Sequence, residues 1–523
     1  QMTSIDPEDP FIYENLQNLR TPQGLFQIEA ETNFKVCRKV KPKSLEQLSA
    51  VVAIARPGAL DFADQYATYS ASGVFQLVHD FFKDELSYTG GIPLYQEQLM
   101  KMAVRLGFTL DESEQLRRIV GKKKVDQMPA WQGKIRQKVA EQNLDPAIGD
   151  VLWKVAEDSA NYSFNKSHSI SYAILAAWTA YLKFKYPHEF FLALLRLSKF
   201  EPDSHQEINK ISKELVFFDI KLLPPDLAKS SLDFKIEDGN IRFGLNSIKG
   251  VSEKTLQSLQ NFRETTTPTK FDIFISAKQA GINIGVLSSL IQAGTLGSYT
   301  HRRSRLVLEA QAFNVLTDKE KKFACSVGPK YDYDILNIIS ECAFKAQSVN
   351  ESGKPFMNEK RKATFKKKYD EYKKIYEQNK NYEKFANWVF ENRLLGYTPT
   401  IRLKTIFQQS ECTFTDTLEF HSAFKEDRIK MIGVIDDVYK GKTKKSNSTF
   451  YRFQLKDEVG SISAMFLDGG KHQRLTEYLE DGLKIPDKES IVVFTGRKGD
   501  DVLWIESIGI LDEKIYMKLS DIE

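Results

Sequence analysis

The fold is decided by an apolar, aromatic-rich segment at 169–197, SISYAILAAWTAYLKFKYPHEFFLALLRL. Its length and apolar character predict a buried helix. Proline disfavours helical backbone at the residue before it, so we expect this helix to stop near Pro187 and to resume at His188. Aromatic side chains in such a segment most often pack in a core, and we expect the same here. Apolar residues recur at three- and four-residue spacing from Pro93 onward, which predicts helical structure as far as Leu197.

The composition is that of a globular protein with more than one domain. The chain has 523 residues, of which 41% are hydrophobic and 28% are charged. With about 100 to 200 residues per domain, this length predicts roughly three or four domains. No uninterrupted apolar run approaches the roughly 18 residues that a membrane span needs, and no basic and apolar leader opens the sequence. We therefore expect a cytoplasmic protein without a membrane partner.

The cysteines and histidines give no sign of a metal site. The four cysteines lie far apart, without the paired spacing of zinc ligands or of a disulfide framework, and the seven histidines are scattered. We expect reduced, mostly buried thiols and no metal bound by this chain alone. The cysteines are Cys37, Cys325, Cys342 and Cys412.

Positive charge is concentrated in two places, although the net charge is only +4. Five of the eight residues in 117–124 are basic and none is acidic, and 354–384 holds eleven Lys or Arg against five Asp or Glu. Local concentrations of this kind neutralise phosphates even in a nearly balanced protein. The plainer alternative for 117–124 is a solvated helix end.

Aromatic residues in the second basic segment follow helical spacing. They form one stripe of a helix whose other faces carry lysines. We favour a packed stripe with a solvated basic face over direct contact with DNA. The stripe consists of Phe365, Tyr369, Tyr372 and Tyr376.

The chain changes character after Lys199. Short strand-like segments flank Asp238-Gly239, which predicts a hairpin. Two helix–glycine–helix segments follow, at 248–256 and 287–296, and they resemble helix-hairpin-helix units. A glycine turn of this kind lets backbone N–H groups approach a DNA phosphate, where the helix dipole also favours negative charge. The DNA-binding candidates of the first unit are Lys249, Gly250 and Lys254.

From Arg428 the sequence takes on a β pattern. Five short strands, with a basic loop between the first two, suit a small barrel of the OB type. Such barrels bind single strands on aromatic platforms and basic loops. The candidate platforms are Tyr451, Phe453, Phe466 and Trp504, some of which strand alternation turns inward, and the basic loop supplies Lys442, Lys444 and Lys445.

A series of short motifs stands in a fixed order along the chain. They are Thr21-Pro-Gln-Gly-Leu-Phe-Gln-Ile-Glu, Ala55-Arg-Pro-Gly, Tyr95-Gln-Glu-Gln, Leu116-Arg-Arg-Ile-Val-Gly-Lys-Lys-Lys, Phe164-Asn-Lys-Ser-His-Ser, Tyr181-Leu-Lys-Phe-Lys-Tyr-Pro-His-Glu-Phe, Leu223-Pro-Pro-Asp, Ser247-Ile-Lys-Gly-Val and Leu395-Gly-Tyr-Thr-Pro. Together they resemble the bacterial replicative DNA polymerase III alpha subunit, a C-family polymerase, from its fingers to its OB fold. The resemblance covers nearly the whole chain and is weakest in 317–390.

The resemblance implies a multi-domain fold that is mainly α and ends in a small all-β barrel. The expected domains are the polymerase fingers at 1–215, a helix-hairpin-helix domain for duplex DNA at 216–312, a helical, Lys/Tyr-rich connecting region at 313–426 and an OB-fold domain at 427–523.

The fingers of this family close over the incoming nucleotide and the template. Positive groups beside the triphosphate stabilise the charge that shifts onto the leaving pyrophosphate. By resemblance, Arg117 and Arg118 grip phosphate oxygens. The further nucleotide-binding candidates are Lys122, Asn165, Lys166 and His168, and the DNA-binding candidates on the same face are Arg56, Lys123 and Lys124.

The two-metal chemistry of the family uses palm aspartates in a PDIDIDF-type and a DFLGL-type motif, and this sequence contains neither motif. We therefore expect no catalytic residue and no cofactor on this chain, and we expect Mg²⁺ to be bound by the palm of a partner. A sliding clamp is a further candidate partner, although no convincing clamp-binding Gln-x-x-Leu-Phe lies in 310–395.

Two hypotheses follow. The leading one is a part of a split replicative polymerase, from a phage or another mobile genome, acting in the cytoplasm of a bacterial or phage-infected cell. It would bind primer-template DNA and a deoxynucleoside triphosphate and join a palm-bearing chain for DNA-templated DNA synthesis. The alternative is a catalytically inactive DNA-binding protein that keeps the fingers, hairpins and barrel. A neighbouring reading frame that ends in the palm aspartates would favour the first.

Overall fold

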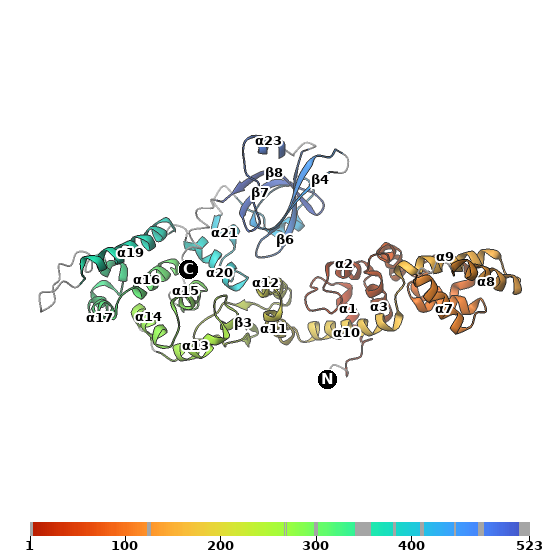
Figure 1. Ribbon diagram of the computed structural model, residues 1–523, viewed down its shortest axis with the longest axis horizontal. Coiled ribbons are helices and arrows are strands. Elements are labelled where there is room, and N and C mark those ends of the chain that lie inside the picture. Colours follow the sequence, from red (N-terminus) through yellow and green to blue (C-terminus); the bar gives the residue numbers. More distant parts are fainter. Residues whose placement is uncertain are drawn as a thin grey trace. The chain divides into compact units, whose positions relative to one another are not determined.

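The computed structural model forms two compact units, Gln1–Phe191 and Leu192–Glu523 (Figure 1). The division falls inside helix α11 (Pro187–Leu197), and the four predicted domain ranges stay predictions. No helix in the described ranges has the length and apolar character that crossing a bilayer requires. The structure describes residues 4–122, 127–265, 267, 269–297, 302–339, 357–379, 383–407, 413–443, 446–468 and 475–511.

The first unit is helical, with hydrophobic cores in two places. The first core lies among α1 (Pro10–Gln17), α2 (Glu31–Val40), α3 (Leu45–Ile54), α4 (Ala63–Ser72) and α10 (Lys166–Lys185). The second lies among α5 (Lys83–Leu86), α6 (Gln96–Arg105), α7 (Leu110–Gly121), α8 (Met128–Glu141) and α9 (Pro146–Tyr162).

Helix α10 is the long helix that the sequence predicts. It begins after Asn165, whose side chain accepts a hydrogen bond from the His168 N–H, and it ends at Lys185, just before Pro187 starts α11. The predicted interruption at the proline is confirmed. The buried seam of α10 is made of alanines, and Tyr181 and Phe184 are only partly buried beside it. The prediction that the aromatic side chains form this core is therefore only partly right, because small residues let α10 approach α3 closely. The seam alanines are Ala173, Ala176, Ala177 and Ala180.

One charged side chain of α10 is buried. The Lys183 ammonium donates hydrogen bonds to the carbonyl oxygens of Thr21, at 2.5 Å, and Gln23, at 2.7 Å, and it lies 5.4 Å from the centre of the Phe191 ring. Carbonyl groups and an aromatic face compensate part of the cost of removing this cation from water. Lys183 thereby fixes the loop before α2 against α10.

After the end of α11, the second unit continues with α12 (Ser204–Leu215) and a small sheet in the order β1 (Leu222–Leu223), β3 (Asn240–Arg242), β2 (Lys235–Glu237). Asp238 and Gly239 join β2 to β3 with φ of 50° and 72°. Asp and Gly are the residues that adopt positive φ most readily in a tight hairpin, so the predicted hairpin is confirmed.

Short helices with glycine turns follow the sheet. Gly250 and Gly294 both have positive φ, at 91° and 80°. A Cβ on Gly294 would lie 2.6 Å from Nη2 of Arg303, whose guanidinium forms a buried ion pair with Glu391 at 2.8 Å. The helices are α13 (Leu256–Arg263), α14 (Lys270–Gln279), α15 (Ile284–Gln292), α16 (Arg303–Asn314), α17 (Asp318–Val327) and α18 (Ile335–Ile338).

Helix α19 (Glu359–Asn379) carries the aromatic stripe. Phe365 and Tyr369 are buried, whereas Lys366, Lys367 and Lys368 are exposed. The packed stripe with a solvated basic face is confirmed for these residues. Three shorter helices lead to the barrel: α20 (Glu383–Leu395), α21 (Leu403–Phe407) and α22 (Thr417–Ser422).

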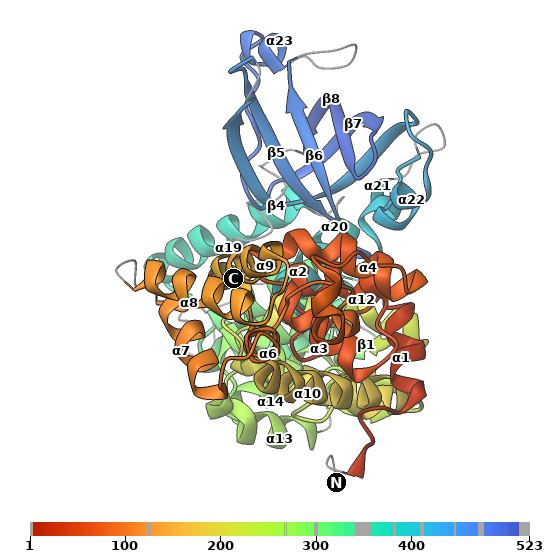
Figure 2. The ribbon, with the colours of Figure 1, turned by 90° about the vertical axis from the view of Figure 1, so that its right-hand side faces the viewer.

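The C-terminal strands close a barrel in the order β4-β5-β6-β8-β7 (Figure 2). The pairs are antiparallel except β6 with β8, and this parallel pair together with the strand order is that of an OB-type barrel. The predicted fold class is confirmed. The elements are β4 (Arg428–Lys442), β5 (Thr449–Lys456), β6 (Ser461–Leu467), α23 (Leu475–Glu480), β7 (Ile491–Lys498) and β8 (Val502–Ile510).

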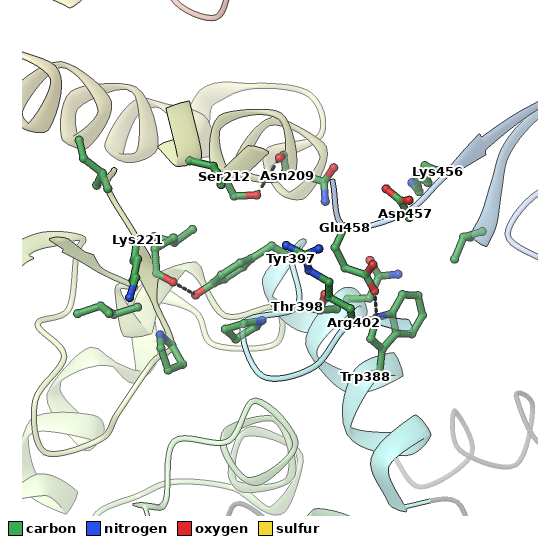
Figure 3. A pocket seen from close by; sticks show the side chains of 18 of the residues that line it. Asn209, Ser212, Lys221, Trp388, Tyr397, Thr398, Arg402, Lys456, Asp457 and Glu458 are labelled. Atoms are coloured by element: carbon green, nitrogen blue, oxygen red, sulfur yellow. Dashed lines mark hydrogen bonds between the residues drawn. The ribbon is translucent and has the colours of Figure 1, made fainter. Parts of the chain in front are cut away.

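A cavity of about 650 Å³ lies between the barrel and the helices of its unit (Figure 3). Asn209 and Ser212 of α12 line it, as do Tyr397 after α20 and Asp457 at the end of β5. The Tyr397 hydroxyl donates to the Leu222 carbonyl at 3.3 Å.

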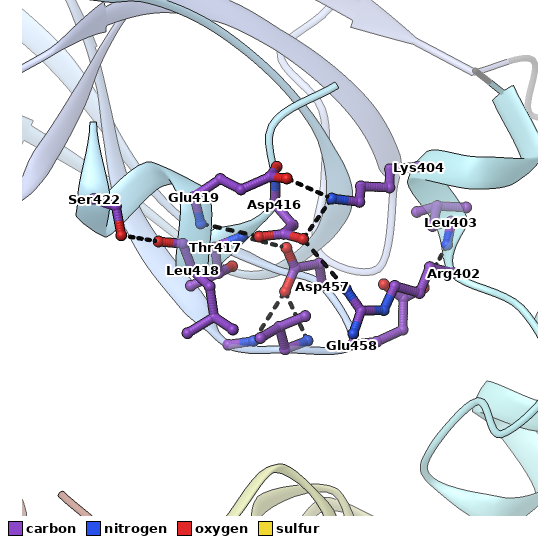
Figure 4. Close-up of polar contacts among 12 residues, drawn as sticks. Arg402, Leu403, Lys404, Asp416, Thr417, Leu418, Glu419, Ser422, Asp457 and Glu458 are labelled. Carbon is purple, nitrogen blue, oxygen red and sulfur yellow. Dashed lines mark hydrogen bonds and ion pairs between the residues drawn. The ribbon is translucent and has the colours of Figure 1, made fainter. Parts of the chain in front are cut away.

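The turn between β5 and β6 fastens the barrel beside this cavity (Figure 4). Glu458 accepts hydrogen bonds from the Trp388 indole and from the Leu403 N–H, the latter at 2.7 Å. Asp457 accepts from the Thr417 N–H at 2.7 Å. Burial raises the pKa of Glu458. These hydrogen bonds attach the β5–β6 turn of the barrel to α20, α21 and α22, in addition to the covalent connection through the chain.

Candidate nucleotide and nucleic-acid interface

The end of α7 and the facing side of α9 line a cavity of about 490 Å³ in the first unit. Arg117, Arg118 and Lys122 contribute three cationic side chains to its wall, so the structure brings these predicted residues together. The cavity is also lined by three polar side chains: Gln96 of α6, Ser159 of α9, and Ser163 just after α9.

Both arginines are held by one carboxylate. Glu114 accepts from Nε and Nη2 of Arg117 at 2.7 and 2.6 Å and from Nε of Arg118 at 2.7 Å. The Arg117 hydrogen bonds lower the pKa of Glu114 to about 2, with Arg118 contributing. Arg117 also donates to the Gln96 side chain at 3.2 Å. The Arg118 side chain stays 65% exposed, so its remaining N–H groups are accessible to an anion.

Asn165 and Lys166 lie at the N-terminus of α10, and a second carboxylate connects them with the start of α6. Glu97 accepts from the Asn165 side chain and from the Lys166 N–H, both at 2.9 Å. The Lys166 ammonium pairs with Glu46 at 3.1 Å and lies 4.3 Å from the centre of the Tyr88 ring. These contacts fix the two residues in place, and neither of them lines the cavity of Arg117 and Arg118.

His168 belongs to a column of ring contacts. Its ring centre lies 5.4 Å from that of Phe164 and 4.2 Å from that of Tyr172, and Tyr172 lies 5.3 Å from Phe26. The guanidinium of Arg56 lies 4.4 Å from the Phe164 ring centre. His168 and Arg56 are exposed, and Phe26 is 37% exposed. Exposed rings next to cations are the surface on which unpaired bases stack.

Sequence reasoning missed Phe26 and Tyr172 in this column. Tyr172 stands four residues after His168 on α10, and that helical spacing could have indicated it. Phe26 lies within the quoted motif at 21–29. Its N–H is held by Thr179 Oγ1 at 3.1 Å, which only the fold reveals.

The first glycine turn of the second unit presents its predicted residues to solvent. Lys249, Gly250 and Lys254 are exposed. Two amides of the turn are already used inside the protein, because the Lys249 N–H donates to the Leu394 carbonyl and the Val251 N–H to the Ile248 carbonyl, both at 3.0 Å. The lysine side chains are therefore better placed for a phosphate than these two amides.

Two of the side chains predicted to stack with bases on the barrel surface are not at the surface. Phe453 and Phe466 are fully buried in the barrel core, because strand alternation turns both inward. Tyr451 is half-buried against the same core. Lys442 is exposed at the end of β4. The remaining predicted lysines, Lys123, Lys124, Lys444 and Lys445, lie outside the described residues.

The outer face of the barrel carries a different row of side chains. Adjacent strands pair Tyr439 with Arg452, Arg452 with Met465, and Met465 with Trp504. The Arg452 guanidinium lies 5.2 Å from the Tyr439 ring centre, and the Tyr439 ring lies 6.0 Å from that of Phe450. Tyr439 is 50% exposed, and Met465 and Trp504 are half-buried. We call Tyr439, Phe450, Arg452, Met465 and Trp504 the outer row.

Of the outer row, sequence reasoning named only Trp504. The others were missed because cross-strand neighbours depend on register, which a single sequence does not reveal. The described residues hold no group of three His, Cys, Asp or Glu side chains that could bind a metal ion.

Comparisons with known proteins agree with the order of these regions. Residues 1–143 match the family model of the bacterial DNA polymerase III alpha subunit finger domain, and 219–306 match a helix-hairpin-helix motif. The chain is 26% identical over 505 residues to the DNA polymerase III subunit alpha of Thermus aquaticus, an alignment that covers 95% of this chain and 38% of that protein.

Two further relatives bear the same name. The subunit of Aquifex aeolicus is 37% identical over 308 residues, which is 57% of this chain and 26% of that protein. The subunit of Campylobacter jejuni is 27% identical over 501 residues, which is 92% of this chain and 38% of that protein. The chain thus spans less than two fifths of the curated relatives it matches. It is a relative of the bacterial DNA polymerase III alpha subunit, over the region that runs from the fingers into the helix-hairpin-helix motif.

Proposed function

We propose that this chain supplies the nucleotide-binding and DNA-binding part of a C-family replicative DNA polymerase. The observation that carries the proposal is the cavity of the first unit, where Arg117, Arg118 and Lys122 converge within the segment that matches the finger model. Three cations around one cavity suit a triphosphate, because charge-assisted hydrogen bonds to phosphate oxygens are among the strongest in proteins.

Template and primer would bind on the other surfaces. The ring column of Phe26, His168 and Tyr172 offers stacking to unpaired template bases, and Arg56 beside it offers a cation to the backbone. Exposed Lys249 and Lys254 at the glycine turn suit the phosphates of the duplex. The outer row of the barrel suits a single strand, because it alternates rings, a guanidinium and a thioether across neighbouring strands.

The chemical step needs carboxylates that these 523 residues do not supply in the palm motifs. In the split-polymerase form of this proposal, the palm and its Mg²⁺ belong to a partner chain. When bound, the metal ions would stabilise the charge on the attacking and leaving oxygens. The residues of this chain would hold the triphosphate, orient the nucleotide against the template and fix the duplex.

Reconstitution tests the proposal. The chain is mixed with the palm-bearing protein of the same genome, and single-nucleotide primer extension is measured. We expect extension only from the mixture, and Arg118→Ala should lower kcat/KM for the nucleotide by about 10- to 150-fold, equivalent to about 1.5 to 3 kcal/mol for a lost charge-assisted contact. Arg136→Ala is the matched control, because Arg136 is an exposed arginine of the same unit outside the cavity.

Two results would contradict the proposal. An unchanged kcat/KM in Arg118→Ala would remove this residue from the nucleotide site. DNA binding without extension in any mixture would instead favour the alternative, a catalytically inactive DNA-binding protein.

A further inference from the structure

A groove of about 890 Å³ lies in the second unit among α14, α15, α16 and α17. None of the residues assigned above to nucleotide or DNA lines it. Its volume is in the range of about 300 to 1,000 Å³ that is usual for ligand sites. The groove is therefore separate from the candidate nucleotide and DNA residues described above.

The floor of the groove is apolar. Phe274 of α14 and Phe313 of α16 are buried there, with ring centres 5.4 Å apart, and Leu287 of α15 is buried beside them. Ile275 is half-buried and extends the apolar surface. Because the two phenylalanines and Leu287 are already almost fully buried, the apolar surface that a ligand could still remove from water is that of half-buried Ile275 and Ile284, and such burial is the main driving force for apolar contacts.

The rim of the groove is cationic. Lys278 of α14 and Lys321 and Lys322 of α17 line it, against one acidic lining residue, Asp318. The Lys321 ammonium lies 5.6 Å from the centre of the Phe313 ring, directly at the apolar floor. Burial and the neighbouring Lys278 ammonium lower the pKa of Lys321. Two like charges at an apolar floor are stabilised when an anion pairs with both of them.

We propose that this groove docks an acidic amphipathic helix of a partner protein. The apolar side chains of that helix would fill the floor at helical spacing, as in other helix-in-groove complexes, and its carboxylates would pair with Lys278 and Lys321. The charge of the rim selects this occupant, because Asp318 is the single acidic lining residue against three lysines, and a basic or purely apolar segment would leave this excess of positive charge uncompensated.

Cys325 offers a direct probe of the groove. It is a free, half-buried cysteine that lines the groove, whereas Cys37 is a free cysteine that is fully buried in the first unit. Burial raises the pKa of Cys37 to about 12 and also raises the pKa of Cys325. Because the thiolate is the reactive form and Cys37 is fully buried, alkylation at mildly alkaline pH should modify Cys325 and leave Cys37 intact, as an internal control for folding of the first unit.

The experiment compares two synthetic peptides on the full chain. In one, leucine and phenylalanine recur at helical spacing and glutamate fills the other side; in the other, glutamine replaces every glutamate. The rate of Cys325 alkylation is followed by mass spectrometry as each peptide is added. We expect the acidic peptide to protect Cys325 and to bind about tenfold more tightly than its glutamine counterpart, because two rim ion pairs are involved.

Variants locate the effect. Lys278→Glu combined with Lys321→Glu should weaken the acidic peptide about tenfold or more, whereas Lys330→Glu, at an exposed lysine outside the groove, should leave its affinity within about twofold. Unmodified Cys37 shows that the first unit is folded, and thermal unfolding of each variant, compared with that of the native chain, checks the second unit. Equal protection by both peptides, or no protection by the acidic one, would overturn the proposal. So would protection that rises with protein concentration without peptide, because a second copy of the chain would then be the occupant.

Discussion

Replacing Glu114 by glutamine should tighten nucleotide binding. In the free protein this carboxylate accepts hydrogen bonds from Arg117 and Arg118 at 2.6 to 2.7 Å, so a triphosphate that enters the cavity meets a negative charge beside two of its three cations. Glutamine is nearly the same size and keeps one acceptor oxygen, but it carries no charge. The substitution therefore removes a competitor of the phosphate without opening a hole.

The magnitude follows from Coulomb's law. A phosphate on the far side of the Arg118 guanidinium would lie roughly 6 Å from the Glu114 carboxylate, where two unit charges repel by about 0.7 kcal/mol in water and about 2.8 kcal/mol at an effective dielectric constant of about 20. Because the Arg118 side chain is 65% exposed, solvent and salt screen the site and favour the lower value. We expect Glu114→Gln to tighten binding by about three- to tenfold.

Isothermal titration calorimetry with a deoxynucleoside triphosphate measures the effect, and inorganic tripolyphosphate isolates the phosphate contribution. Arg118→Ala should change both affinities in the opposite direction. Glu114→Gln thus reports on the negative charge that competes with the phosphate, and Arg118→Ala reports on the loss of a contact with the phosphate. If Glu114→Gln weakened binding as much as Arg118→Ala does, Glu114 would serve to orient the arginines, and the competition argument would be refuted.

The pH dependence of Glu114 gives a control for this comparison. Its pKa is lowered from 4.5 to about 2 in the folded protein, so the stabilisation that its ionised form provides is fully present above about pH 4.5 and is lost as the pH falls toward about 2. The carboxylate is therefore ionised at every pH used for nucleotide binding. The difference between the native protein and Glu114→Gln should be the same at pH 6 as at pH 8, within about twofold.

Two further outcomes are expected. Trp504→Ala should weaken binding of single-stranded DNA by about 1 kcal/mol or more, roughly fivefold, because one stacking surface is lost from the outer row. Fluorescence anisotropy measures this affinity. Phe424→Ala is the control and should have no effect, because Phe424 is 81% exposed and lies outside the outer row. Arg303→Ala should destabilise the second unit by about 3 to 5 kcal/mol, because the buried Glu391 carboxylate loses its ion-pair partner at 2.8 Å. Calorimetry measures this loss. Arg302→Ala, at the exposed neighbouring residue, should cost no more than about 0.5 kcal/mol. Comparable losses in Phe424→Ala or Arg302→Ala would count against the respective argument.

Local chemistry explains which parts of the fold could be predicted from the sequence. The break before Pro187 and the hairpin at Asp238-Gly239 were predicted correctly, because each depends on the backbone preferences of one or two residues. The small barrel was predicted from five short strand-like segments in the sequence, and the observed strand order confirms it. The core of α10 was predicted less well, because its alanine seam depends on how closely α3 approaches.

In the candidate site, too, local contacts could be predicted from the sequence and contacts between distant segments could not. The contact of Glu114 with Arg117 and Arg118 spans three and four residues of one helix, so the sequence contained the signal, although it was not used. Phe453 was wrongly placed at the surface, because strand alternation alone does not say which parity faces inward. The pairing of Tyr439, Arg452 and Met465 required the register of three strands. Contacts between distant segments were thus the part that the sequence did not reveal.

The central claim, that this chain grips primer-template DNA through its phosphates, is tested most directly by the salt dependence of DNA binding. The purified chain is titrated against a fluorescent primer-template at several salt concentrations, and log Kd is plotted against log salt. We predict a steep straight line: for each tenfold rise in salt, the logarithm of the affinity should fall by about 0.9 for every duplex phosphate that the chain neutralises. We also predict little preference for sequence, because lysine and arginine side chains contact phosphates and not base edges. No detectable binding at low salt, or an affinity that does not change with salt, would contradict the claim.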